Sequence, residues 1–446
     1  MESTLSTKNT VSQAVDEPIL NIQGGARLEG DVAVPGAKNA ALPLLVAASL
    51  SNEDVRLENV PLGLNDIQLL LGLLRTLGVS VQEQSDGSLI FNGSGWTNSE
   101  LDGDQVGRLR HSLLLLGGAA HLQSALFLPL PGGCNLGSRK HDLHLDAFAA
   151  LGLSVSEEEE GISLELGSTP EITELKFHYP SFGATLNFIF AATGLRGTHT
   201  LHNAARNPEV LDVIDLLNKM GASIVWRDEA ALEVQGGTKL HGTEHRVMAD
   251  RIIASTLIAA TAVTQGHSLL RYASTKVLKA EIEVWERSGL SLTQTDDGIE
   301  VKTNGRQQAV SITTRAYPGF HTDIQPLHAA MMVYAQGESM ITETILDGRF
   351  RYAQELAKMG ASAVIEDGDF VCVNGTPGQI LRIEGRTNLH GARVKATDIR
   401  GGAAVVITAL AAQGKTEVYN LYQLERGYGD LGGLLNSLGA SITRSA

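Results

Sequence analysis

Two kinds of helical pattern alternate along the chain. In the first kind, an amphipathic stretch runs into Leu, Met or Ser followed by Gly-x-Ser, and a strand-like stretch follows. This pattern recurs at intervals of about 70 residues, which predicts a repeat architecture. The six glycines are Gly78, Gly152, Gly221, Gly289, Gly360 and Gly439. Each stands where a helix is expected to stop in a left-handed conformation, because glycine has no Cβ to clash there.

Each repeat also contains a second helix that is apolar all round, which is typical of a helix buried on every side. These helices are predicted to begin near Asn39, Arg110, Phe182, Arg251, Ile324 and Arg400, and most to end at Gly117, Gly197, Gly266, Gly337 and Gly414. A β-rich stretch follows each one: Val55–Leu57, Leu126–Leu128, Thr198–Leu201, Ser268–Leu270, Met340–Thr342 and Glu417–Tyr419. We therefore expect an α/β fold with outer sheets around buried parallel helices.

A chain of 446 residues is too long for one ordinary core, so six repeats suggest two domains of three units each. A solenoid is the alternative. It predicts atypical terminal units and no chemistry, whereas these units differ most at their polar loops.

Composition excludes several classes of protein. With 43% hydrophobic and 19% charged residues the chain resembles a globular protein, and 5% aromatics with a net charge of -15 argue against a nucleic-acid partner. No apolar run approaches the roughly 18 residues of a membrane span, and residues 1–17 are predicted to be a disordered extension without a secretory signal. Two cysteines give no disulfide framework. We expect a cytoplasmic enzyme, either a monomer or a weak oligomer.

Unusual polar residues gather at two equivalent loop positions in the repeats. At the start of the apolar helices stand Lys38-Asn39, Arg110, Ser181-Phe182-Gly183, Asp250-Arg251, Thr322-Asp323 and Asp398-Ile399-Arg400. After the β-rich stretches stand Pro131-Gly132-Gly133-Cys134 with Arg139, Ala205-Arg206, Asp347-Gly348-Arg349 and Glu425-Arg426-Gly427. One such residue is usually a helix cap or a surface pair. Cations that recur at equivalent loops instead predict an anion site suited to a phosphate and a carboxylate.

The two cysteines differ in their surroundings. Cys134 lies in a Gly-rich loop with Arg139 and Lys140 close behind, and nearby cations favour a reactive thiolate. Cys372 lies in an apolar strand-like stretch, which is typical of a buried structural cysteine. His141 and His144 flank Asp142 without further ligands at metal-site spacing, so no metal and no cofactor is expected. The acidic run from Glu157 to Glu160 is expected to be a solvated hairpin tip.

Several motifs, in order and similarly spaced, resemble the UDP-N-acetylglucosamine 1-carboxyvinyltransferase family from about Ile19 to the C-terminus. They are Gly36-Ala37-Lys38-Asn39-Ala40-Ala41-Leu42-Pro43, Pro131-Gly132-Gly133-Cys134, Asn203-Ala204-Ala205-Arg206, Thr322-Asp323, Ala396-Thr397-Asp398-Ile399-Arg400 and Arg426-Gly427-Tyr428. The resemblance implies an inside-out α/β barrel: two domains, each of three βαβαββ-type units around buried parallel helices. It further implies one domain made of residues 18–37 and 249–446, with residues 38–248 inserted as the other.

The resemblance also implies the reaction and its residues. An enolpyruvyl group would pass from phosphoenolpyruvate to the 3-hydroxyl of UDP-N-acetylglucosamine in the first committed step of peptidoglycan synthesis, and fosfomycin would label the enzyme. The implied phosphoenolpyruvate ligands are Lys38, Arg139, Arg349 and Arg426. The implied ligands of the nucleotide sugar are Asn39, Arg110, Asp142, Leu143, Ser181, Phe182, Gly183, Asp323 and the backbone at Ile345.

Catalytic roles follow from the same resemblance. Asp323 would take the proton of the attacking hydroxyl, and Cys134 would protonate the enolpyruvyl methylene. Asp398 would assist proton transfer, while Arg400 supports the cleft. An acid, a base and a cationic clamp suffice for this chemistry without a metal.

The chain departs from the family on the acceptor side. Tyr179 stands where a Lys is common, Asn207 where a Glu is common, and His321 where a Pro is common; Lys140-His141 replaces a Pro-containing pair. Asp347-Gly348 replaces Glu-Asn, and Gln423 and Glu425 replace a His and an Asp. One hypothesis is that Lys140 restores the cation lost at Tyr179.

These departures leave three readings open: the peptidoglycan enzyme in a divergent form, the same transfer to another nucleotide or nucleotide sugar, and a non-catalytic binding paralogue. The last would be expected to lose Cys134, Asp323 or a clamp arginine, and all of these are present.

Overall fold

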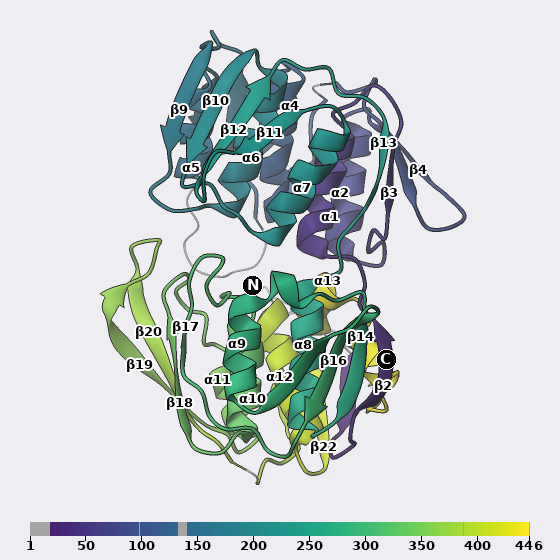
Figure 1. Ribbon diagram of the computed structural model, residues 1–446, viewed down its shortest axis with the longest axis vertical. Coiled ribbons are helices and arrows are strands. Elements are labelled where there is room, and N and C mark those ends of the chain that lie inside the picture. The colour runs from purple at the N-terminus through teal and green to yellow at the C-terminus, as the bar shows by residue number, and fades with distance from the viewer. Residues whose placement is uncertain (1–17, 98, 133–140, 387, 446) are drawn as a thin grey trace, which may run out of the picture.

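The computed structural model describes residues 18–97, 99–132, 141–386 and 388–445. Cys134, Arg139 and Lys140 lie outside the described residues, as does the predicted extension 1–17. The described chain forms six sheets and two hydrophobic cores. The first lobe comprises the residues around the core built between Ala37 and Val247, and the second lobe those around the core built from Leu20–Val34 and Ile252–Ile442. Figure 1 shows the lobes one above the other.

Three sheets surround the first lobe. Their orders are β13-β3-β5-β4, β6-β8-β7 and β11-β12-β10-β9. The strands are β3 (Val55–Glu58), β4 (Ser80–Glu83), β5 (Leu89–Asn92), β6 (Leu126–Pro129), β7 (Ser154–Glu157), β8 (Gly161–Glu165), β9 (Ile172–Lys176), β10 (Gly197–His202), β11 (Ser223–Trp226), β12 (Ala231–Gly236) and β13 (Thr243–Arg246). The helices are α1 (Lys38–Ala48), α2 (Asn65–Thr76), α3 (Gly103–Gly107), η1 (Arg110–Leu113), α4 (Leu114–His121), α5 (Asp142–Ala150), α6 (Phe182–Gly194) and α7 (Pro208–Lys219).

Three further sheets surround the second lobe. Their orders are β21-β22-β1-β23, β15-β16-β14-β2 and β17-β18-β20-β19. The strands are β1 (Ile19–Gln23), β2 (Glu29–Ala33), β14 (His267–Arg271), β15 (Leu290–Gln294), β16 (Gly298–Thr303), β17 (Ile312–Thr313), β18 (Glu338–Glu343), β19 (Ser362–Val371), β20 (Pro377–Glu384), β21 (Arg393–Lys395), β22 (Lys415–Tyr419) and β23 (Ser441–Ser445). The helices are α8 (Arg251–Val263), η2 (Thr275–Val277), α9 (Lys279–Arg287), α10 (Gln325–Tyr334), α11 (Ala353–Lys358), α12 (Ile399–Ala411), α13 (Leu421–Tyr428) and α14 (Leu431–Asn436).

The apolar helices begin where the sequence predicts. α1, α6, α8, α10 and α12 start within one residue of the predicted positions, and α4 directly follows η1, which starts at Arg110. Every side chain of α8 and nearly every one of α12 is buried. The sheets lie outside these helices, as Figure 1 shows. Each of the six predicted β-rich stretches lies within a strand.

The structure confirms one prediction about glycines and contradicts another. The six repeat glycines all have a positive φ, between 78° at Gly152 and 99° at Gly221 and Gly289. The predicted helix end at Gly117 is wrong, because α4 continues to His121. Gly117 instead permits close packing of α4 on α6, since an added Cβ would lie 2.6 Å from Oδ1 of Asn187.

The chain crosses between the lobes twice, and the two crossings are hydrogen-bonded to each other. Ala37 N donates to Met248 O (2.8 Å), and Asp250 N donates to Pro35 O (2.9 Å). Asp250 caps α8 and also accepts from Lys38 N at 3.2 Å, which sets the starts of α1 and α8 side by side. The domain limits at 37/38 and 248/249 stay a prediction, although β1 pairs with β22 and β23, and β2 with β14.

None of the helices in the described ranges combines the length and the apolar character that crossing a bilayer requires.

Candidate active site

Two adjoining pockets lie where the lobes meet. The charged pocket has a volume of about 280 Å³ and takes residues from both lobes. Its charged lining residues are Lys38, Asp66, Arg110, Glu209, Arg251, Asp323, Arg349, Asp398, Arg400 and Arg426. Six cations therefore face four carboxylates, and this excess of positive charge favours an anionic ligand. The second pocket, of about 400 Å³, shares Arg110, His111, Phe182 and Leu346 with it. It is named the acceptor-side pocket because Ser181 and Gly183, which were predicted to bind the acceptor, line it.

A carboxylate holds two of the predicted clamp cations together. Asp66 Oδ2 lies 3.0 Å from Lys38 Nζ, and Asp66 Oδ1 lies 3.1 Å from Arg426 Nε. Burial alone would raise the pKa of Asp66, but the charges of Lys38 and Arg426 outweigh it and hold that pKa below its usual value. Asp66 thus remains a carboxylate. It joins α1, α2 and α13 across the boundary between the lobes.

Asp323, the predicted base, lies between two arginines. Its Oδ1 accepts from Arg349 Nη2 at 2.6 Å, and its Oδ2 lies 3.5 Å from Arg400 Nε. Arg349 Nη1 also lies 3.6 Å from Asp398 Oδ1. Asp398 caps α12 by accepting from Arg400 N and Gly401 N. The starts of α10 and α12 are thereby tied to the Arg349 loop.

Arg349 keeps donors available for a ligand. Its side chain is fully buried, and its Nε and Nη1 have no hydrogen-bond partner among the described residues. Nη1 of the buried Arg400 is likewise without one in the described part of the chain. Buried guanidinium N–H groups are costly to leave unpaired, so these atoms suit hydrogen bonds to a phosphate or carboxylate.

A second buried ion pair closes another wall of the charged pocket. Arg251 Nε lies 2.8 Å from Glu209 Oε1, and the two side chains come from different lobes. His321 lines the same wall. Burial, together with the charge of the nearby Arg251, lowers the pKa of His321 to about 4. Its Nδ1 accepts a hydrogen bond from Asp323 N at 3.1 Å, so the imidazole is neutral with its proton on Nε2.

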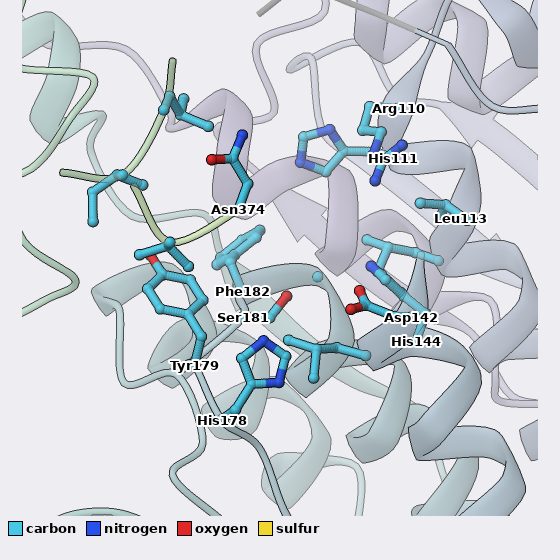
Figure 2. A pocket seen from close by; sticks show the side chains of 16 residues that line it. Arg110, His111, Leu113, Asp142, His144, His178, Tyr179, Ser181, Phe182 and Asn374 are labelled. Carbon is cyan, nitrogen blue, oxygen red and sulfur yellow. The ribbon is translucent and has the colours of Figure 1, made fainter. Parts of the chain in front are cut away.

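The acceptor-side pocket is mostly uncharged. Among its described lining residues, Arg110 and Asp142 are the charged ones. Figure 2 shows Arg110 and His111 on one side of this pocket and Tyr179 and His178 on another. Burial raises the pKa of Tyr179 to about 12, with a further contribution from Glu343, so Tyr179 is a neutral phenol and supplies no cation.

The residues at the start of α6 line this pocket. Ser181 caps the helix, its Oγ accepting from Ala184 N at 3.4 Å. Gly183 packs on His144, since an added Cβ would lie 2.9 Å from the imidazole Cε1. Phe182 contacts His111 edge-on, with ring centroids 6.4 Å apart. Leu143 and Ile345 also line this pocket.

The chain matches the model of the family described as EPSP synthase (3-phosphoshikimate 1-carboxyvinyltransferase) over residues 22–433. The chain belongs to this family. It is also 36% identical over 425 residues to UDP-N-acetylglucosamine 1-carboxyvinyltransferase 1 of Staphylococcus aureus, covering 95% of this chain and 98% of the relative. The same-named protein of Staphylococcus epidermidis is 36% identical over the same length and coverage. The chain is therefore an enolpyruvyl transferase, as predicted.

Solved structures agree with this assignment. The enolpyruvyl transferase NikO from Streptomyces tendae is similar with a TM-score of 0.84 and 25% identity, covering 96% of this chain and 99% of that one. EPSP synthase from Acinetobacter baumannii shares the fold with a TM-score of 0.72 at 16% identity, covering 96% of this chain and 100% of that one. The predicted fold class, an inside-out α/β barrel in two parts of three units each, is confirmed.

Most of the residues predicted for this enolpyruvyl transferase come together. Lys38, Asn39, Arg110, Phe182, Asp323, Arg349, Asp398, Arg400 and Arg426 line the charged pocket. Asp142, Leu143, Ser181, Gly183 and Ile345 line the acceptor-side pocket, with Arg110 and Phe182 shared. Their individual roles stay predictions. Cys134 and Arg139 lie outside the described residues.

Three further predictions, on Arg206, Cys372 and the acidic run, can be compared with the structure. Arg206 lines neither pocket: its guanidinium stacks on Trp226, 4.7 Å from the ring centroid. Cys372 is buried as predicted, with its Sγ 3.5 Å from Glu343 O. The acidic run is the exposed β7–β8 turn, yet Glu157 also lies 2.7 Å from His141.

Two charged residues that line the charged pocket, Asp66 and Glu209, were missed from the sequence, and so was Glu343, which supports the loop beside it. Glu343, at the end of β18, accepts from Ile345 N (2.9 Å) and Leu346 N (3.2 Å) and so shapes the loop that lies between the pockets. It also accepts from Thr322 Oγ1 at 3.0 Å. In sequence, Asp66 and Glu209 resemble ordinary first-turn caps of α2 and α7. Only the partners that face them after folding distinguish them.

Proposed function

We propose that this enolpyruvyl transferase moves the enolpyruvyl group of phosphoenolpyruvate to the 3-hydroxyl of UDP-N-acetylglucosamine and releases phosphate, the first committed step of peptidoglycan synthesis. The observation that carries the proposal is the charged pocket, which Lys38, Arg349, Arg400 and Arg426 line together with Asp323 and Asp398. The names of the 36%-identical relatives support this choice of acceptor.

In this proposal the clamp cations bind the phosphate and carboxylate of phosphoenolpyruvate. Protonation at C3 builds positive charge at C2, the acceptor hydroxyl adds to C2, and Asp323 takes the proton of that hydroxyl. Loss of phosphate and of one proton from C3 restores the double bond. Arg349 supports this role, because its contact with Asp323 at 2.6 Å orients the carboxylate.

Cys134 is the proposed acid that protonates C3, with Asp398 assisting proton transfer. The test is covalent labelling by fosfomycin, followed by mass spectrometry of Cys134→Ala and Cys372→Ala. Labelling should vanish in the first variant and persist in the second, where the buried thiol is the one removed. Labelling that survives in Cys134→Ala would show that another thiol reacts.

A second acceptor, another uridine nucleotide or nucleotide sugar, is favoured by one observation. The acceptor-side pocket holds Tyr179 as a neutral phenol, and Arg110 is its cation among the described lining residues. The described residues therefore offer a diphosphate little positive charge in this pocket. The similarity to NikO at a TM-score of 0.84 is compatible with this reading.

Phosphate release discriminates between these acceptors. The full-length protein is incubated with phosphoenolpyruvate and UDP-N-acetylglucosamine, UDP-glucose, UDP or UMP, with Asp323→Asn as the inactive control. Release with UDP-N-acetylglucosamine is expected. Release with another nucleotide alone would replace the first proposal by the second, and no release with any acceptor would contradict both.

A further inference from the structure

Arg110 stands at the junction of the two pockets. It is the first residue of η1, directly before the buried helix α4, and it lines both cavities. A guanidinium at this place reaches ligand groups on either side of the junction. Arginine has a long side chain with several rotatable bonds, so its direction must be set by neighbouring groups if it is to meet a ligand in one geometry.

Two residues extend from Arg110 in a chain of short contacts. Arg110 Nη1 lies 2.6 Å from His141 Nε2, and His141 Nδ1 lies 2.7 Å from Glu157 Oε1. The His141 side chain is only 10% exposed, whereas that of Glu157 is 38% exposed at the end of β7. The chain thus runs from the pocket junction to the protein surface.

Donor and acceptor roles in this chain are fixed by elementary chemistry. A guanidinium carries only N–H donors, so His141 Nε2 must be the acceptor. The imidazole proton is then on Nδ1, from which it is donated to the Glu157 carboxylate. His144, a second histidine near His141, has its own partner, because Asn187 Nδ2 donates to His144 Nδ1 at 2.8 Å.

We propose that His141 is a positioning residue that directs Arg110 toward the acceptor, with Glu157 fixing the tautomer that makes this possible. The inference rests on the proposed enolpyruvyl transfer and deepens it. Losing the His141 contact removes one hydrogen bond that orders Arg110, and part of the cost of ordering this side chain is then met when the acceptor substrate binds. The loss should therefore appear in the acceptor KM more than in kcat.

Four variants test this series of contacts from Arg110 to Glu157. His141→Ala removes the hydrogen-bond acceptor of Arg110. His141→Gln restores one, because an amide oxygen accepts from Arg110 while the amide N–H₂ group faces Glu157. Glu157→Ala leaves His141 in place but frees its tautomer. The matched control is Glu159→Ala in the same exposed β7–β8 turn, which removes an equal charge without touching His141.

Initial rates of phosphate release, measured while the concentration of the acceptor substrate and then of phosphoenolpyruvate is varied, give kcat and KM. Melting temperatures verify that each variant folds. His141→Ala should raise the KM for the acceptor by about tenfold, as expected for losing a hydrogen bond to a charged group, and His141→Gln should recover most of it. Glu157→Ala should have a smaller effect in the same direction, and Glu159→Ala should match the wild type.

The outcomes separate the inference from the proposed function. An active wild type whose acceptor KM stays unchanged in folded His141→Ala and in Glu157→Ala overturns the positioning role alone. An equal rise of the acceptor-substrate KM in His141→Gln and His141→Ala also overturns it. The rise would then come from the lost imidazole side chain and not from the lost hydrogen-bond acceptor. A wild type that neither releases phosphate nor binds UDP-N-acetylglucosamine or UMP in calorimetry overturns both proposals.

Discussion

Asp66 Oδ1 lies 3.1 Å from Arg426 Nε, and this ion pair joins α2 of the first lobe to α13 of the second. The other oxygen of Asp66 lies 3.0 Å from Lys38 Nζ. All three side chains are nearly inaccessible to solvent. The carboxylate therefore fixes two clamp cations in place before any anion is bound.

Replacing Asp66 should expose the repulsion between those cations. Asp66→Asn leaves two buried positive charges with a neutral amide, and breaking a buried pair in this way costs about 3 kcal/mol. The free energy of unfolding in urea should fall by this amount without ligand. Phosphoenolpyruvate should recover part of the loss, because its negative charges take the place of the carboxylate.

The control for this variant is Asp86→Asn, at an exposed pair with Arg56, which should change the unfolding free energy by less than about 0.5 kcal/mol. If Asp66→Asn is no less stable than this control, Asp66 does not compensate Lys38 and Arg426 in solution.

The buried pair between Glu209 and Arg251 should show strong coupling. Glu209→Gln and Arg251→Met each leave one charge of the pair without its hydrogen-bonded partner beside His321, and each should lower the unfolding free energy by about 3 kcal/mol. The double variant removes both charges, so its loss should be smaller than the sum by about 2 kcal/mol. Additive losses in the urea unfolding of these three variants would show that the pair contributes no mutual stabilisation.

The repeat was predictable from the sequence because its signals are local. Where an amphipathic helix ends in a left-handed conformation, backbone sterics alone favour glycine, and all six such glycines have a positive φ. Helices without a polar face were bound to be central. Gly117 was misread for the converse reason: its glycine is required by the approach of Asn187 from α6, which no local pattern records.

The site was predictable where a residue type recurred at equivalent loops, as for Lys38, Asp323, Arg349 and Asp398. Asp66 and Glu343 were not predictable, because their function depends on partners from other segments. Asp66 meets Arg426 from the far end of the chain, and Glu343 organises Thr322 and Ile345 on two different loops. His141 illustrates the same limit, since its tautomer depends on Glu157 beyond the end of α5.

Buried histidines should make the protein sensitive to mild acid. His328 accepts a hydrogen bond from Trp285 Nε1 at 3.3 Å through Nδ1 and lies 2.9 Å from Val310 O through Nε2, so it is neutral. Burial lowers its pKa to about 4. Between pH 6.5 and 4 the unfolded chain binds a proton at this residue and the folded protein does not, so stability falls as the pH falls.

The expected loss from His328 is about 1.6 kcal/mol between pH 6.5 and 5. Urea unfolding, followed by tryptophan fluorescence at the two pH values, measures it. His328→Gln should reduce the difference between the two free energies by that amount, while His267→Gln, at an exposed site beside Glu300, should leave it unchanged. An equally steep pH dependence in His328→Gln would contradict the assignment of this proton.

Tyr179 provides the sharpest test of the acceptor. It lines the acceptor-side pocket as a neutral phenol, with its pKa raised to about 12 by burial and by Glu343. Tyr179→Lys places a cation there, and an ion pair of moderate exposure contributes about 1 kcal/mol. If the phosphates of UDP-N-acetylglucosamine lie in this pocket, its KM should fall about fivefold in Tyr179→Lys.

Tyr179→Phe, which removes only the hydroxyl, is the matched control. A KM that rises for UDP-N-acetylglucosamine in Tyr179→Lys but stays constant in Tyr179→Phe would place the phosphates elsewhere, and would favour an acceptor that needs no cation at this wall.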